Sequence, residues 1–96
     1  MTFAKQYVLT AAEDKVTDLK RALLALASRV RNIPGSSSVD VLQDRDDPAN
    51  FLFIEHWDSA EAHQSGGKAL GKEAFAPIMD AVGAPPKAYS LDRLTD

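Results

Sequence analysis

The segment Phe51–Trp57 (FLFIEHW) constrains the fold of this chain more than any other. It is rich in aromatic and β-branched residues, which favours a strand. Because successive side chains of a strand point to opposite faces, Phe51 and Phe53 lie on one face, while Leu52 and Ile54 lie on the other. Both faces of this strand are therefore apolar. A sheet built around it needs helices on one face and a second cover on the other.

The residues before this strand predict two further strands with a helix between them. The strands are expected over residues 3–9 and 37–43. Thr10 and Glu13 have capping-box spacing, so we expect the helix to begin directly after Thr10. Its apolar stripe has steps of three and four residues and consists of Val16, Leu19, Leu23, Leu26 and Val30.

The residues after this strand predict a second helical region and a last strand. Asp58 and Glu61 form another capping-box pair, which predicts a short helix. We expect Gly66-Gly67 to break this helix. A second helix is expected over residues 68–82, with a kink at Pro77, and a last strand over residues 87–94.

This order, β-α-β-β-α-β, predicts an α+β fold of the ferredoxin-like type, with a four-stranded antiparallel sheet and helices on one of its faces. The chain has 96 residues, so we expect a single domain over residues 1–96. Helices cover only one apolar face of the sheet, and the other is too large a patch for a soluble monomer. The sequence therefore predicts a homodimer that buries this second face.

Composition argues against several classes of protein. The net charge is −3 with both signs interleaved, so we expect no nucleic-acid partner. No segment approaches the ~20 apolar residues of a membrane span, and the start of the chain does not resemble a signal peptide. Cysteine is absent and there are two histidines, which predicts no metal site. A small domain without disulfides favours a cytoplasmic location.

Candidate functional side chains gather around the strand Phe51–Trp57. Phe53, Glu55 and Trp57 share a face, which we assign to the helix side because the next helix begins directly after Trp57. Glu55 is either a base with a raised pKa or a carboxylate paired with a cation at the surface. Trp57 either lines a ligand cavity and donates its indole N–H or packs in the core.

Three further side chains are candidates for the same site. His63 lies six residues beyond Trp57 and is either an acid–base group or a solvated surface residue. Gln6 and Tyr89, from the first and last strands, are candidates for binding a substrate. The ring of Tyr89 either closes the cavity or only packs.

Several segments together resemble the antibiotic biosynthesis monooxygenase family, which has a dimeric α+β barrel fold. They are Ile33-Pro34-Gly35, residues 39–48 (VDVLQDRDDP), residues 51–57 (FLFIEHW), residues 58–63 (DSAEAH) and Gly83-Ala84-Pro85. The resemblance covers nearly the whole chain. It implies a homodimer with one cavity in each protomer, between sheet and helices.

The resemblance implies a cofactor-independent monooxygenase that binds a small or polycyclic, quinol-like aromatic. In such enzymes the deprotonated substrate reacts directly with O₂. Trp57 and Glu55 match the family's E-x-W pattern, and His63 falls where some members place a polar aromatic group. The haem-degrading branch is the least similar, because residues 66–82 contain no histidine. Two alternatives stay open: a non-catalytic ligand-binding or regulatory module, and an isomerase or lyase that uses the same pocket without O₂.

Overall fold

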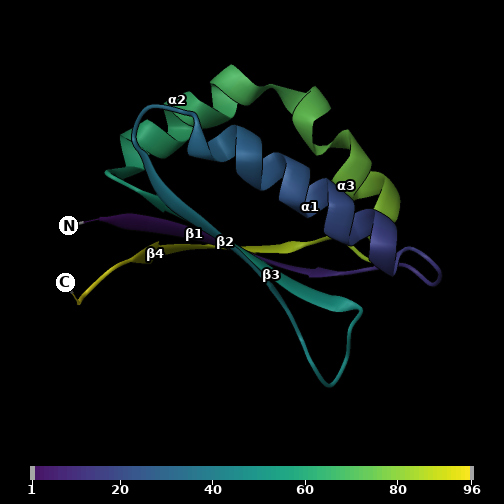
Figure 1. Ribbon diagram of the computed structural model, residues 1–96. Helices are drawn as coiled ribbons and strands as arrows, with labels where there is room; N and C mark the ends of the chain where they lie inside the picture. The colour runs from purple at the N-terminus through teal and green to yellow at the C-terminus, as the bar shows by residue number, and fades with distance from the viewer. Residues whose placement is uncertain (1, 96) are drawn as a thin grey trace.

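The computed structural model describes residues 2–95 and has the predicted ferredoxin-like α+β fold (Figure 1). Its elements are β1 (Phe3–Thr10), α1 (Val16–Arg31), β2 (Ser36–Gln43), β3 (Asn50–Trp57), α2 (Ala60–Leu70), the 3₁₀ turn η1 (Lys72–Phe75), α3 (Ala76–Ala81) and β4 (Lys87–Asp92). The four strands form one antiparallel sheet in the order β2-β3-β1-β4. The strand that the sequence most strongly predicted, β3, is thus a central strand.

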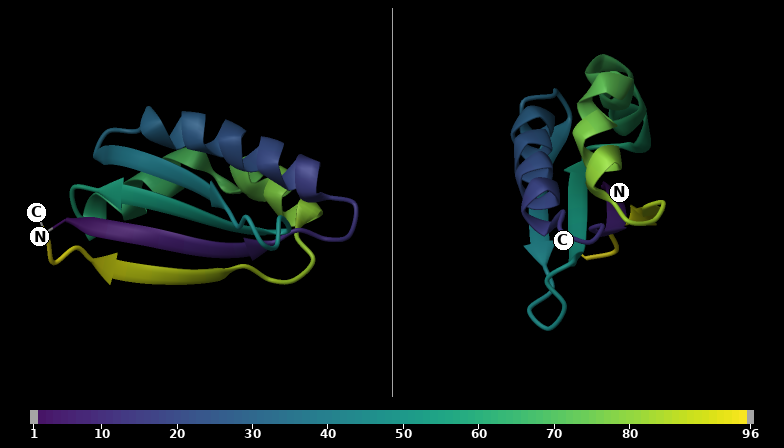
Figure 2. Two further views of the ribbon diagram at one scale, coloured as in Figure 1. Left: turned by 60° about the horizontal axis from the view of Figure 1, so that its bottom comes forward. Right: turned by 90° about the vertical axis from the view of Figure 1, so that its right-hand side faces the viewer.

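Burial along β3 alternates strictly and confirms which face carries the helices. Phe51, Phe53 and Trp57 are all at most 2% exposed, whereas Leu52 and Ile54 are only half-buried. Both views in Figure 2 show the helices on one side of the sheet. The interpretation that Trp57 and Phe53 face the helices is therefore correct.

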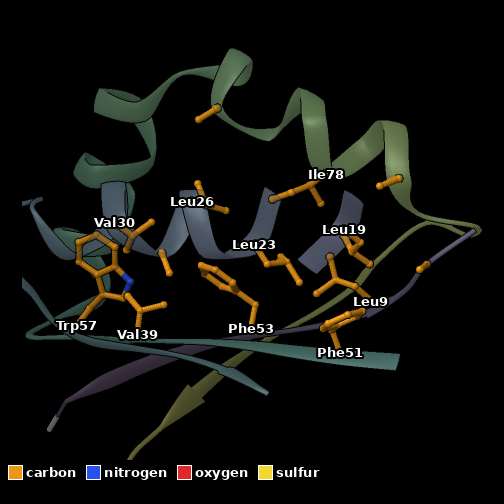
Figure 3. Packing of buried hydrophobic residues seen from close by; sticks show 14 residues of the cluster. Leu9, Leu19, Leu23, Leu26, Val30, Val39, Phe51, Phe53, Trp57 and Ile78 are labelled. Carbon is orange, nitrogen blue, oxygen red and sulfur yellow. The ribbon is translucent and has the colours of Figure 1, made fainter. Parts of the chain in front are cut away.

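The core is the apolar stripe of α1 packed on this face of the sheet. Leu19, Leu23 and Val30 are at most 1% exposed. Figure 3 shows that they lie above the aromatic side chains of β3, with Trp57 near the end of the helix at Val30. The predicted helix and its buried stripe are confirmed.

The predicted cap of α1 is wrong. Thr10 belongs to β1, and its hydroxyl donates a 2.8 Å hydrogen bond to the Asn50 side chain instead of capping a helix. Ala11 then pairs with Val82, and Asp14 takes a left-handed φ of 68° in the turn that follows. The helix can begin only after this turn, at Val16.

The second helical region also differs from its prediction. The helix α2 continues through Gly66 and Gly67 and ends before Gly71, whose φ is 75°. Pro77 does not kink a long helix, because it lies in the first turn of α3. A proline is tolerated there, since the first N–H groups of a helix have no partner within the helix.

The uncovered face of the sheet, which we call the open face, remains rich in apolar side chains. It includes Leu42 of β2 and Tyr89 and Leu91 of β4, which are 50%, 45% and 41% exposed. Of the helices in residues 2–95, none has the length and apolar character needed to cross a membrane.

Candidate active site

A buried carboxyl group lies at the end of β3 where α2 covers the sheet. Glu55 is only 3% exposed. Trp57 follows two residues later on the same face, and its Nε1 donates a hydrogen bond of 2.9 Å to Glu55 Oε1. Alternation along the strand explains the pairing, because residues i and i+2 point to the same side.

His63 joins this pair from the first turns of α2. The helix is capped by Ser59, whose hydroxyl accepts a 3.1 Å hydrogen bond from the Ala62 N–H, and not by the predicted Asp58. His63 Nε2 lies 3.7 Å from Glu55 Oε1, and its ring meets the Trp57 ring edge-on with centroids 5.6 Å apart. The structure therefore brings together three of the predicted site residues.

The surroundings shift the pKa values of the acid and the base toward each other. Burial raises the pKa of Glu55 above its usual range, although the Trp57 hydrogen bond and the charge of Lys5 oppose this shift. Burial also lowers the pKa of His63, and the charge of Lys5 lowers it further. Both shifts favour the neutral forms. Shifts in these directions lower the free-energy cost of moving a proton from His63 to Glu55.

Strand β1 contributes two residues that the sequence did not identify as part of the site. Lys5 pairs in register with Glu55, and its Nζ donates a 2.9 Å hydrogen bond to Ser90 Oγ. Tyr7 contacts Phe53 edge-on, at a centroid separation of 6.2 Å. Burial, together with the Glu55 charge, raises the pKa of Tyr7 to about 12. The alternation of β1 puts Lys5 and Tyr7 on one face, but only the register with β3 shows which face it is.

A cavity of about 190 Å³ lies beside this cluster, between the sheet and the helices. Its walls include Leu23 and Leu26 of α1, Ile78 and Met79 of α3, and Tyr7 and Phe53 of the sheet. Phe53, a predicted substrate-binding residue, is thus one of the residues that line this cavity. Trp57, Glu55 and His63 do not contribute to these walls, so the cluster and the cavity are neighbours that meet at Tyr7 and Phe53.

The predicted placement of Gln6 and Tyr89 in this site is wrong. Gln6 pairs in register with Ile54 and with Tyr89, and paired residues share a face of the sheet. Both side chains are thus on the open face, opposite Glu55 and Trp57. Within residues 2–95, no group of three or more metal-ligating side chains gathers at one place.

Comparison with known proteins supports the resemblance noted in the sequence. Residues 2–65 match the sequence model of the antibiotic biosynthesis monooxygenase family. No curated protein matches the chain significantly.

Solved structures with the same fold cover nearly the whole chain. A proposed antibiotic biosynthesis monooxygenase from Nitrosomonas europaea has a TM-score of 0.88 at 20% identity, over 97% of this chain and 90% of its own. PA3566 from Pseudomonas aeruginosa has a TM-score of 0.82 at 26% identity, over 98% and 95%. Rv0793 from Mycobacterium tuberculosis has a TM-score of 0.84 at 17% identity, over 100% and 98%.

Proposed function

The chain belongs to the antibiotic biosynthesis monooxygenase family, and on that premise we propose that it is a cofactor-independent monooxygenase of a quinol-like aromatic. The reaction balances with O₂ as the only co-reactant. A quinol and O₂ give a hydroxyquinone and water, so one oxygen atom enters the ring and the other leaves as water. The substrate supplies all four electrons. The protein then has to bind the quinol, remove a proton and stabilise the resulting anion.

The observation that carries this proposal is the buried Glu55 carboxyl 3.7 Å from His63 Nε2. A base works best when its pKa is near the working pH, and burial moves the pKa of Glu55 in that direction. The separation of 3.7 Å is longer than a hydrogen bond. Such contacts often tighten only when a substrate is bound.

Each neighbour of Glu55 has a distinct role in this proposal. The indole N–H of Trp57 fixes the orientation of the carboxyl group. His63, whose side chain is 22% exposed, passes the proton between the buried carboxyl and solvent. The ammonium group of Lys5 supplies positive charge on the same face, where it stabilises the substrate anion as it forms.

The proposal includes a homodimer that covers the open face. Leu42, Tyr89 and Leu91 are exposed there, beside the half-buried Leu52 and Ile54. Burying an apolar side chain contributes roughly 1.5–3 kcal/mol, so several such residues together offset part of the cost of association. A two-fold interface is the commonest way for a soluble protein to cover such a face.

A second candidate is a ligand-binding module without turnover. The walls of the cavity favour it, because they contain Tyr7 and Phe53 but neither Glu55 nor His63. If the ligand remains within these walls, it binds without reaching the acid–base pair.

Oxygen uptake separates the two candidates. The purified protein is mixed with a quinol in an oxygen electrode, and the product is identified by mass spectrometry with ¹⁸O₂. The monooxygenase proposal expects uptake of one O₂ per quinol and one ¹⁸O atom in the product. Binding of the quinol without uptake above the protein-free rate establishes the second candidate. Conversion of the quinol in the absence of O₂ contradicts both.

A further inference from the structure

We infer that the cavity beside Glu55 accepts a single-ring phenol, whose hydroxyl group hydrogen-bonds to Tyr7 and whose ring lies between Phe53 and the leucines of α1. Describing this ligand as the substrate rests on the proposed function. The binding itself rests only on the size, the walls and the opening of the cavity.

The size of the cavity limits the ligand to about one ring. Its volume is about 190 Å³. An apolar cavity of about 150 Å³ binds one benzene molecule, whereas pockets for drug-sized molecules measure about 300–1,000 Å³. Three fused six-membered rings do not fit inside this volume, so such a ligand has to extend out through the opening of the cavity or move the helices away from the sheet. Within the substrate range that the family resemblance implies, the cavity volume therefore favours single-ring aromatics over polycyclic ones.

The walls select an aromatic ligand with one polar group. Leu23 and Leu26 from α1 and Ile78 from α3 offer only hydrocarbon surface, and Phe53 adds an aromatic face. A ligand that is already charged in solution would lose its hydration against these side chains without gaining a partner from them. An uncharged ring instead gains apolar burial and an aromatic contact.

Tyr7 supplies the polar group that orients the ring. Among the hydrogen bonds within residues 2–95, none involves the Tyr7 hydroxyl, so this group is free to bind a ligand. The pKa of about 12 keeps it protonated at neutral pH, as a hydrogen-bond donor. Tyr7 pairs in register with Phe53, which lies two residues before Glu55 on the same face of the sheet. A ligand oxygen at Tyr7 therefore lies on the side of the cavity nearest the acid–base pair.

The cavity opens at the edge of the sheet formed by β4. Ala88 of β4 and Met79 of α3 both line it, and both are exposed. A small ligand can enter between them while the core residues stay in place. A second hydroxyl group, as in a 1,4-quinol, can point toward this opening and remain hydrated.

Binding of three probes by calorimetry tests the inference without any turnover. The probes are p-cresol, toluene and 9-phenanthrol, which differ in the hydroxyl group and in the number of rings. We expect p-cresol to bind more tightly than toluene and more tightly than 9-phenanthrol. Tighter binding of 9-phenanthrol than of p-cresol, or no binding of p-cresol, overturns the inference. Either result leaves the oxygen-uptake test of the proposed function unaffected.

Two variants locate the ligand. Tyr7→Phe should weaken p-cresol binding about three- to tenfold, as expected for one lost hydrogen bond, and leave toluene binding unchanged. Ala88→Leu should abolish binding of p-cresol, because the larger side chain enters the cavity from an exposed position and does not disturb the core. Lys87→Leu is its control, since Lys87 pairs with Val8 on the open face. Unchanged p-cresol binding in either Tyr7→Phe or Ala88→Leu contradicts the assigned site.

Discussion

The Nε1 atom of Trp57 donates a 2.9 Å hydrogen bond to Oε1 of Glu55, two residues earlier on the same strand. Both side chains are at most 3% exposed, so the carboxyl group has lost most of its water. One hydrogen bond does not replace the hydration of a carboxylate, and the raised pKa of Glu55 follows from this deficit. The bond also holds the carboxyl oxygen toward His63.

Glu55→Gln removes the ionisable group and keeps an oxygen that can accept the Trp57 hydrogen bond. If Glu55 is the base, the rate of oxygen uptake should fall by about 10²–10⁴. The melting temperature should change little, because the shape and the hydrogen bond are retained. Glu61→Gln is the matched control, since Glu61 is exposed on α2 and should have no effect on the rate. A Glu55→Gln protein with the full rate excludes Glu55 as the base.

The raised pKa of Glu55 also predicts how stability depends on pH. The folded protein binds the Glu55 proton more tightly than the unfolded chain, whose pKa is near 4.5. The stability from this group is therefore fully present below pH 4.5 and is lost as the pH rises through the folded pKa. In urea unfolding experiments, the free energy of unfolding of wild type should fall relative to that of Glu55→Gln as the pH rises from 4.5 through the folded pKa. If the difference in the free energy of unfolding between the two proteins does not change with pH, the pKa of Glu55 is not raised.

His63 should produce the opposite slope. Its folded pKa lies below the unfolded value of 6.5, so the folded protein holds this proton less tightly. The contribution of His63 is fully present above pH 6.5 and is lost as the pH falls through the folded pKa. In the same urea experiment, wild type should lose stability relative to His63→Gln as the solution is acidified from pH 6.5. If wild type instead gains stability relative to His63→Gln on acidification, the fold stabilises His63 as a cation.

Alternation within β3 was enough to predict that Phe53, Glu55 and Trp57 share a face, and the start of the next helix directly after Trp57 assigned that face to the helix side. Both signals are local. The placement of Gln6 and Tyr89 required the register of β1 and β4 against β3, which is a long-range property. A shift of one residue moves a side chain to the other face of the sheet. Lys5 and Tyr7 were missed for the same reason. The sequence shows that their side chains share a face of β1, but only the register with β3 shows that this is the face covered by the helices.

The prediction that Gly66-Gly67 breaks the helix is wrong, and the packing of Trp57 against Gly66 explains why. A Cβ atom at Gly66 would lie 2.5 Å from Cη2 of Trp57. Gly66 is thus the position where the indole ring meets the backbone of α2, and the helix accepts a poor helix-former to allow this contact. Local propensity could not reveal this role, because Trp57 lies nine residues away.

Gly66→Ala should therefore destabilise the protein, although alanine favours helices. The added methyl group must displace the Trp57 ring, and such overpacking costs roughly 1–3 kcal/mol. Gly67→Ala is the control on the same helix, since nothing lies within 4 Å of its added Cβ. That variant should gain about 0.5–1 kcal/mol. Urea unfolding followed by Trp57 fluorescence measures both changes. Equal effects of the two substitutions would contradict the close packing of Trp57 on Gly66.

Leu42→Lys should convert the proposed homodimer into a monomer. Leu42 is 50% exposed on the open face, where a second copy would cover it, and a lysine there would place an unpaired charge in an apolar interface. Leu24→Lys is the matched control, because Leu24 is 51% exposed but belongs to α1, on the other side of the sheet. Light scattering at micromolar concentration should give a dimer for wild type and Leu24→Lys and a monomer for Leu42→Lys. A dimer that persists in Leu42→Lys and is lost in Leu24→Lys would move the interface from the sheet to the helices.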